Sequence, residues 1–205
     1  MLTIIDYNIG NLGSIHNMLK RIGIPSQVTS NIDIISNASK LILPGVGHYD
    51  YGMQQLHLTG LIPILNKKVL VHKTPILGIC LGVQLLTQCS DEGTEKGLGW
   101  IQGKTIAFDK SKLSPTQKIP NMGWANVANY NQSKLFDHMH PNPKFYFVHS
   151  YHLDLYSEHD TLVTAHYGYN FAAGIEHHNI LGVQFHPEKS HKYGMKLFEN
   201  FYNNY

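Results

Sequence analysis

The sequence is poor in cysteine, in excess charge of one sign and in long apolar runs. Its 205 residues include only Cys80 and Cys89, too few for a disulfide framework, so we expect both thiols to be reduced. The 16 lysines and arginines nearly balance the 14 acidic residues and form no basic stripe, which argues against a nucleic-acid partner. No apolar run approaches the roughly 18 residues of a membrane-spanning helix, and the N-terminus lacks a secretory signal pattern. We therefore expect a cytoplasmic protein with no membrane association.

Metal-ligand and nucleotide-binding patterns are also missing, although the chain has 14 histidines. The histidines are scattered, HExxH and zinc-finger spacings do not occur, and the clusters HMH and HSYH lack an obvious second pair of ligands. The loop DYNIGNLGS has Gly10 and Gly13 but neither G-x-G-x-x-G nor a Walker lysine. We predict no metal and no cofactor, and we expect this loop to lie near the active face.

The first half of the chain alternates short apolar runs with helical patterns. We expect strands at 2–6, 25–30, 40–45 and 74–79, a helix at 14–23 with Ser14 as N-cap and Gly23 at its end, and weaker helical segments to about residue 68. This βαβ order predicts a parallel sheet covered by helices on both faces.

The second half is rich in predicted strands. After a polar, glycine-rich loop at 91–100, strand patterns occur at 103–108, 123–130, 144–155, 161–167, 171–178 and 179–185, and a helix pattern closes the chain at 191–204. The length and a hydrophobic content of 42% fit one domain over residues 1–205.

The stretch PILGICLGVQLL places Cys80 between Gly78 and Gly82, after an apolar run and before a helical pattern. Gly-x-Cys-x-Gly is typical of a nucleophile elbow, where small neighbours let the nucleophile stand exposed at a sharp strand-to-helix turn. The positive end of the helix dipole would favour the thiolate. A core cysteine in a glycine-containing turn is the alternative, and this stretch alone does not separate the two. Cys89 lacks flanking glycines, so we expect it to be a structural thiol.

The stretch VQFHPEKS supplies a candidate base at the end of another apolar strand. Pro187 disfavours the α conformation for His186, and in an extended segment His186 and Glu188 would project to the same side. Ligands of open α/β sheets bind outside the carboxyl ends of the strands, where Cys80 also lies. The joint pattern therefore favours catalysis over an ordinary loop histidine.

The stretch LILPGVGHY ends a third strand in Pro44, Gly45, Val46 and Gly47. Glycines allow the main chain to turn its N–H groups toward a ligand, and such donors, together with the N–H of Leu81, can stabilise the oxyanion formed by attack on a carbonyl. By itself, PGVG could equally be a tight turn.

These motifs resemble the class I (triad) glutamine amidotransferase family along essentially the whole chain. PGVG, GICLGVQLL and FHPEKS occur in the order of the family, and DYNIGNLGSI, NMGW, YFVHSYH and YGYNFAAGIEHHNILGVQFHPEKS resemble its glutaminase subunits of imidazole glycerol phosphate synthase. The resemblance implies a flavodoxin-like, single-domain α/β fold, with an open, mostly parallel twisted sheet, helices on both faces and a β-rich C-terminal half.

The resemblance also implies site residues for hydrolysis of L-glutamine through a Cys-bound glutamyl thioester. By carry-over, the triad is Cys80, His186 and Glu188, the oxyanion hole surrounds Gly47 and Leu81, and Gln84 with the backbone of Ser150 and Tyr151 holds the substrate.

The partner implied by the resemblance is a (βα)₈ cyclase subunit, which forms a heterodimer with the glutaminase and receives its ammonia in histidine biosynthesis. Trp124 in NMGW and Lys189 occupy family positions that face this subunit, although they could also be a half-buried strand aromatic and a solvated lysine.

Several residues depart from the usual pattern of the family, namely Asn8, His48, Tyr49, Asn121 and Ala125. These departures keep open a paralogous glutaminase that supplies a different synthase, such as a nucleotide-sugar amidotransferase of surface-polysaccharide synthesis. A binding module with a vestigial triad and a free-standing thiol hydrolase are the remaining alternatives.

Overall fold

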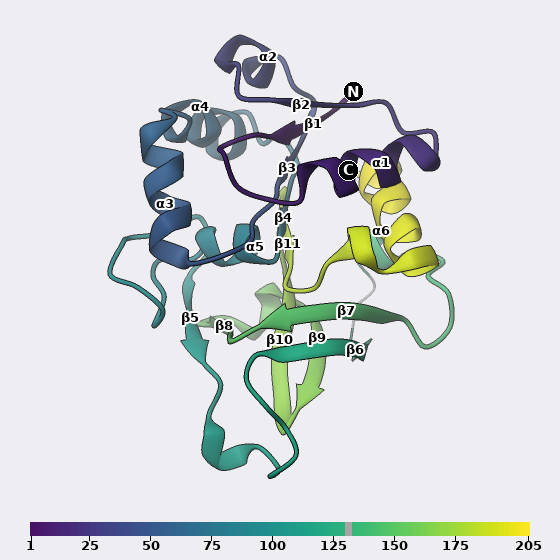
Figure 1. Cartoon of the computed structure of the whole chain (residues 1–205). Coiled ribbons are helices and arrows are strands. Elements are labelled where there is room, and N and C mark those ends of the chain that lie inside the picture. The colour runs from purple at the N-terminus through teal and green to yellow at the C-terminus, as the bar shows by residue number, and fades with distance from the viewer. Residues whose placement is uncertain (130–132) are drawn as a thin grey trace.

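The fold is built on one sheet whose two halves differ in strand direction (Figure 1). A computed structural model describes residues 1–129 and 133–205. Within these residues the sheet has 11 strands. Five neighbouring strands are parallel, in the order β2 (Ser26–Thr29), β1 (Leu2–Ile5), β3 (Lys40–Leu43), β4 (Ile76–Ile79) and β11 (Ile180–Val183).

The remaining strands extend the sheet with antiparallel pairing. From β11 the order continues through β10 (Tyr169–His177), β9 (Thr161–Tyr167), β6 (Asn121–Ala128) and β7 (Lys144–His149). Off this path, β8 (Tyr151–Leu155) pairs with β10 and with β5 (Gly103–Ala107). The parallel strands therefore belong mainly to the first half of the chain, and β11 returns the C-terminal part to the centre of the sheet.

Helices cover both faces of the parallel strands, as predicted. Figure 1 shows α1 (Leu12–Arg21) and α6 (His191–Asn204) on one side, and α3 (Tyr49–Leu58), α4 (Ile62–Asn66) and α5 (Leu81–Leu85) on the other. The helical segments are completed by α2 (Ile32–Ser36), a π-helical turn at Lys67–Val71, and short 3₁₀ turns at Lys110–Lys112, Lys134–Phe136, Glu158–Asp160 and Pro187–Lys189. Among the helices of the described ranges, none is long and apolar enough to cross a membrane.

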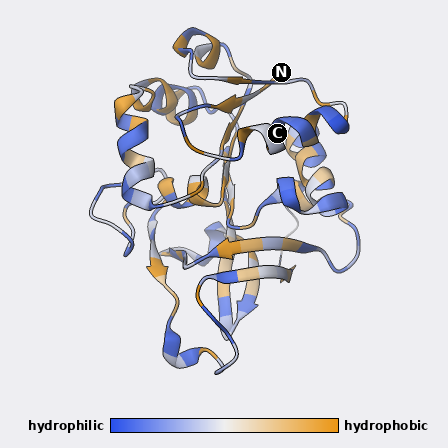
Figure 2. Cartoon of the chain, viewed as in Figure 1, coloured by the Kyte–Doolittle hydropathy of each residue, from blue (hydrophilic) through white to orange (hydrophobic). Residues whose placement is uncertain are grey.

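The alternation of side chains along the central strands divides the core into two clusters. Along β4, Leu77 and Ile79 pack with Leu19 of α1 and Leu197 of α6, whereas Ile76 packs with residues of α3 and α4. Because both faces are buried, these strands are nearly continuous in apolar residues, and they are orange in Figure 2. This packing fixes the positions of the loops that follow β3, β4 and β11.

Most predicted elements are confirmed, and the helix predicted at 191–204 coincides with α6. The predicted N-cap Ser14 is wrong, because α1 begins at Leu12 after Asn11, directly behind the turn at Gly10, whose φ is +118°. Gly23 follows the helix with φ +75°, as expected for a glycine C-terminal to a helix. Most predicted strands differ from the observed ones by one or two residues at their ends. In addition, 144–155 is divided at Ser150 into β7 and β8, and 123–130 ends at a residue outside the described ranges.

Candidate active site

Cys80 occupies a strained turn between β4 and α5. Its φ of +53° and ψ of −113° are unusual for a residue with a side chain, and its N–H donates to the carbonyl of Val183 in β11 at 2.8 Å. A Cβ atom on Gly82 would lie 1.9 Å from the carbonyl oxygen of Leu43, and one on Gly78 would lie 2.9 Å from the backbone of Val83. The two glycines are therefore required because α5 passes directly against β3 and β4.

His186 and Glu188 form a buried pair beyond the end of β11. Nδ1 of His186 and Oε1 of Glu188 are 2.8 Å apart, so Nδ1 carries a proton and donates a hydrogen bond to the carboxylate. Pro187–Lys189 form a 3₁₀ turn rather than the predicted extended segment, and this turn brings Glu188 back under the ring. Nε2 of His186 is buried and has no hydrogen-bond partner among the described residues, so this nitrogen is the one that can take up the proton of the thiol.

The surroundings of His186 favour its protonated form. Burial opposes the charge on the ring, but the neighbouring Cys80 sulfur and the Glu188 carboxylate outweigh this effect and raise the pKa of His186 to about 10. A thiol that gives its proton to such a base leaves a thiolate beside an imidazolium. The pair is therefore suited to nucleophilic attack followed by proton donation to a leaving group.

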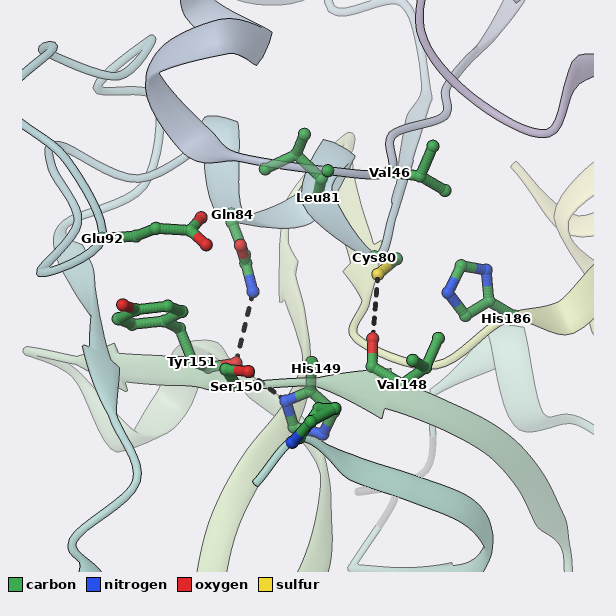
Figure 3. A pocket seen from close by; sticks show the side chains of 12 residues that line it. Val46, Cys80, Leu81, Gln84, Glu92, Val148, His149, Ser150, Tyr151 and His186 are labelled. Atoms are coloured by element: carbon green, nitrogen blue, oxygen red, sulfur yellow. Dashed lines mark hydrogen bonds between the residues drawn. The ribbon is translucent and has the colours of Figure 1, made fainter. Parts of the chain in front are cut away.

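Both Cys80 and His186 face one cavity of about 290 Å³, at the lower end of the size range of small-molecule sites (Figure 3). Cys80 Sγ lies 3.9 Å from the carbonyl oxygen of Val148, to which the thiol donates, and 3.8 Å from Nε2 of Gln184, which donates to the sulfur. The lining residues are Val46, Gly47, Cys80, Leu81, Gln84, Glu92, Pro120, Val148, His149, Ser150, Tyr151 and His186.

The PGVG loop brings only part of its length to this cavity. Val46 and Gly47 line it, and Gly47 has a φ of +99° that suits glycine. Gly45 does not line the cavity, because it packs against α5 so closely that a Cβ atom would lie 2.5 Å from the Gly82 nitrogen. Leu81 contributes the first N–H of α5, which has no acceptor within the helix.

The N-terminal loop supports the PGVG loop from behind, which places it near the active face as expected. Tyr7 is fully buried, and its hydroxyl donates to the carbonyl oxygen of Pro44 at 2.5 Å. Gly10 packs so closely on the ring of Pro44 that a Cβ atom would lie 2.9 Å from it. The first residue of the PGVG loop is therefore held on two sides.

Glu92 is a lining residue that the sequence analysis missed. Its Oε2 accepts the N–H of Tyr49 at 2.8 Å, and it is the only carboxylate among the described residues that line the cavity. Asp50 accepts the N–H groups of Thr94 and Glu95 and so fixes the loop that carries Glu92. The sequence predicts 91–100 only as a polar, glycine-rich loop, and no spacing within it points to a ligand.

His149 is a second lining residue that was missed. Its Nδ1 lies 2.7 Å from the carbonyl oxygen of Tyr151, its Nε2 lies 3.1 Å from Nδ2 of Asn121, and burial lowers the pKa of His149 to about 3. The ring is therefore neutral at physiological pH. The alternation along β7, in which Phe145, Phe147 and His149 are buried, is the signal that could have placed His149 on an inward face.

The two predicted interface residues lie on one face, near the hairpin of β6 and β7. Trp124 is 43% exposed and stacks on His191 at 5.5 Å, and its ring centroid lies 6.2 Å from that of Tyr146. Nζ of Lys189 lies 5.7 Å from the centre of the Tyr146 ring. The carbonyl oxygen of Tyr146 accepts the N–H of His186 at 2.9 Å, which connects this face to the base.

Two expectations about other residues can be compared with the structure. Cys89 is exposed rather than packed in the core, so the expectation of a structural thiol is wrong. It does not line the cavity. No group of three or more His, Cys, Asp or Glu side chains in the described parts of the chain could hold a metal ion.

Comparison with known proteins gives one family along nearly the whole chain. The sequence model described as glutamine amidotransferase class-I matches residues 3–205. Proteins of Methanococcus maripaludis and Pseudomonas aeruginosa, both named imidazole glycerol phosphate synthase subunit HisH 2, are 53% and 42% identical over 201 residues and cover 98% of both chains. A Leptospira interrogans protein named imidazole glycerol phosphate synthase subunit HisH is 39% identical over 201 residues, with the same coverage.

Solved structures share the fold at lower sequence identity. A structure titled glutamine amidotransferase has a TM-score of 0.74 and 16% identity, and covers 97% of this chain and 96% of its own. PurLQS of Thermotoga maritima has a TM-score of 0.72 and 16% identity, with 98% and 97% covered. The mixed α/β sheet with helices on both faces is thus the fold that these proteins share.

Proposed function

The chain belongs to the class I glutamine amidotransferases, and we propose that it is the glutaminase subunit of an imidazole glycerol phosphate synthase. In this proposal residues 1–205 form one amidotransferase domain that hydrolyses L-glutamine and passes the ammonia to a cyclase subunit. The observation that carries the proposal is the shared cavity of Cys80, at its strained turn, and His186, held by Glu188. The names of relatives that match 98% of the chain support the choice of synthase.

The first half of the reaction forms a thioester and releases ammonia. The thiolate of Cys80 attacks the side-chain carboxamide carbon of glutamine, and the oxyanion accepts N–H groups of Leu81 and of the loop that contains Val46 and Gly47. His186, carrying the proton taken from the thiol, then donates it to the nitrogen as the carbon–nitrogen bond breaks.

The second half of the reaction hydrolyses the thioester. Nε2 of the now neutral His186 accepts a proton from water, the hydroxide adds to the thioester carbon, and the carbon–sulfur bond breaks to give glutamate and the Cys80 thiolate. Glu188 keeps Nδ1 protonated and stabilises the imidazolium in both halves, because its carboxylate lies 2.8 Å from that nitrogen.

Charge complementarity suggests how the free end of glutamine binds. The α-ammonium group needs an anionic partner, and Glu92 supplies the carboxylate that faces the cavity. Both N–H groups of the Gln84 amide are directed to protein acceptors, at Tyr151 and Gln184, so its oxygen remains for the substrate. Backbone groups of Ser150 and Tyr151 complete this side of the cavity.

The partner surface in this proposal is the face that includes Trp124 and Lys189. Met122, 62% exposed, and Trp124, 43% exposed, provide apolar area at its centre, and Lys189 provides a positive charge beside the site. A (βα)₈ cyclase subunit docked there as a heterodimer would receive ammonia before solvent protonates it.

The proposal is tested by labelling and by activity. Incubation with 6-diazo-5-oxonorleucine followed by peptide mass spectrometry should give an adduct on Cys80 and none on the exposed Cys89. Glutaminase activity should be weak for the subunit alone and strongly stimulated by a cyclase subunit with its acceptor bound. An adduct on Cys89, or no adduct even with the partner present, would defeat the mechanism.

A second candidate is a paralogous subunit that supplies ammonia to a different synthase, such as a nucleotide-sugar amidotransferase. The departures at Asn121 and Ala125 favour keeping it, because both residues lie on β6, the strand that carries Trp124. Stimulation by the cyclase of histidine biosynthesis supports the first candidate, and stimulation only by a sugar-nucleotide synthase supports the second.

A further inference from the structure

A buried amide lies beneath the nucleophile and is not used by the reaction described above. Gln184 follows β11, is fully buried, and approaches Cys80 Sγ with its Nε2 at 3.8 Å. Its Oε1 accepts a hydrogen bond from Nε2 of Gln84 at 3.0 Å. A polar side chain in an otherwise apolar strand is costly unless both ends of its amide are paired, as they are here.

The direction of these hydrogen bonds is fixed by the carbonyl group of Tyr151. Nε2 of Gln84 also lies 3.2 Å from the carbonyl oxygen of Tyr151, and a carbonyl oxygen can only accept. The Gln84 atom that touches both partners must therefore be the nitrogen. The atom of Gln184 that faces it must be the oxygen, which leaves the NH₂ group of Gln184 facing the sulfur.

The Tyr151 carbonyl oxygen also accepts a hydrogen bond from a second donor, His149. His149 is neutral because burial lowers its pKa to about 3, so its ring carries one proton, and Nδ1 must hold it to donate to Tyr151 at 2.7 Å. Nε2 then accepts from Nδ2 of Asn121 at 3.1 Å. Asn121, His149 and Gln84 together hold the Tyr151 carbonyl group as a fixed acceptor.

We propose that Gln184 is a positioning residue for the nucleophile, and that its amide N–H, oriented through Gln84 and the Tyr151 carbonyl group, stabilises the Cys80 thiolate. An N–H donor is worth more to a charged acceptor than to a neutral one, so the bond favours ionisation of the thiol. The inference rests on the proposed function, because it assumes that the thiolate is the attacking species. The sequence predicts stabilisation of the thiolate by the dipole of the following helix. Because α5 has only five residues, the Gln184 donor takes over part of that role.

The other groups around the sulfur act in both directions. The imidazole of His186 lines the same cavity and favours the thiolate, whereas the carbonyl oxygen of Val148 accepts the S–H at 3.9 Å and favours the thiol. The hydroxyl of Tyr7 is engaged with Pro44, and the carboxylates of Glu92 and Glu188 are engaged with Tyr49 and His186, respectively. Gln184 is thus the uncharged donor that touches the sulfur.

The test measures the pH dependence of Cys80 alkylation in the full chain. Iodoacetamide reacts with the thiolate, and mass spectrometry follows Cys80 separately from the exposed Cys89, which serves as an internal reference. Gln184→Met keeps the length of the side chain but removes the donor. We expect the alkylation midpoint of Cys80 to rise by about one pH unit, a tenfold change in the thiol ionisation constant, with no change for Cys89.

A matched control comes from a second pair of glutamine amides. Nε2 of Gln88 donates to Oε1 of Gln102 at 3.1 Å, outside the cavity. Gln88→Met therefore removes a hydrogen bond between two side-chain amides and should leave the Cys80 midpoint unchanged. If Gln184→Met does not fold, Gln84→Met decides, because it removes the group that orients Gln184 and should raise the midpoint by a smaller amount.

The outcomes separate this inference from the proposed function. An unchanged Cys80 midpoint in a folded Gln184→Met or Gln84→Met variant overturns the inference, even if 6-diazo-5-oxonorleucine labels Cys80 in the wild type. Failure of that label in the wild type overturns the proposed function instead. A loss of glutaminase activity in Gln184→Met that becomes smaller as the pH rises supports the inference, because a purely structural defect would not recover when the thiol ionises.

Discussion

The carboxyl ends of the parallel strands and the antiparallel strands contribute different kinds of side chain to one cavity. Cys80 and His186 follow the adjacent parallel strands β4 and β11, whereas His149 and Tyr151 come from β7 and β8. The first pair is strained or incompletely paired, with a left-handed backbone at Cys80 and an unpartnered Nε2 at His186. In the second pair, both ring nitrogens of His149 and the carbonyl oxygen of Tyr151 are hydrogen-bonded. The comparison teaches that reactivity lies where polar atoms are left free, and orientation where they are paired.

The largest expected effect comes from removing the carboxylate that is hydrogen-bonded to His186. Glu188→Gln removes the charge that stabilises the imidazolium, and we expect kcat to fall by about a thousandfold while KM changes little. Steady-state glutaminase assays with saturating partner measure both constants. Glu158→Gln, which alters an exposed carboxylate of another 3₁₀ turn, is the control. Full activity of Glu188→Gln would show that His186 does not need the carboxylate, and would contradict the assignment of reactivity to Cys80 and His186.

The next effect concerns the close approach of α5 to β3, which fixes the turn at Cys80. Gly82→Ala places a methyl group against the Leu43 carbonyl oxygen, where a Cβ atom would lie 1.9 Å away, and we expect a loss of about 3 kcal/mol in the free energy of unfolding. Gly13→Ala is the matched control, because nothing lies within 4 Å of its Cβ position. Chemical denaturation of both variants measures the difference, and equal stability would show that α5 does not need its close approach.

A smaller effect is expected from the side of the cavity that binds the substrate. Glu92→Gln keeps an acceptor for the Tyr49 N–H but removes the negative charge, so KM for glutamine should rise about tenfold, with a lesser change in kcat. Glu95→Gln changes a half-buried carboxylate of the same loop that does not line the cavity, and it should behave as wild type. A fall in kcat alone for Glu92→Gln would assign that residue to the reacting group instead.

The last effect is a dependence of stability on pH. The pKa of His149 is about 3 in the folded chain and about 6.5 when exposed, so the unfolded chain binds a proton that the folded chain does not between these values. The free energy of unfolding should therefore decrease as the pH falls below 6.5, by about 2 kcal/mol at pH 5 from this residue.

Comparison of wild type with His149→Gln in urea titrations at pH 7 and pH 5 measures that contribution. The decrease on acidification should be smaller in the variant, although part should remain, because burial also lowers the pKa of His152. An equal decrease in both proteins would mean that His149 is hydrated or charged in the folded chain.

The order of the elements and the meeting of the main reacting groups could be predicted from the sequence. Alternating apolar runs and helical patterns indicated a parallel sheet, and in such a sheet the residues that follow neighbouring strands lie at one edge. Cys80 and His186 come together for this reason. Their flanking residues, Gly82 and Pro187, also marked unusual backbone geometry in advance.

The rest of the site depends on contacts that leave no local pattern. Tyr7 reaches Pro44, Glu92 reaches Tyr49, and Gln184 reaches Cys80 across long stretches of chain, and no spacing in the sequence indicates any of these contacts. The extended geometry predicted at Glu188 is also wrong, because the chain forms a 3₁₀ turn after His186 that packs against α6 and against β7, which is distant in the sequence.

The hydrogen bond from the backbone N–H of His186 to the carbonyl oxygen of Tyr146 joins β7 to the segment that carries the base. Trp124 and Lys189 lie near the ring of the same Tyr146, and the imidazole of His186 lines the cavity. If a docked protein shifted β7 by a few tenths of an ångström, this hydrogen bond would therefore pass the shift directly to His186.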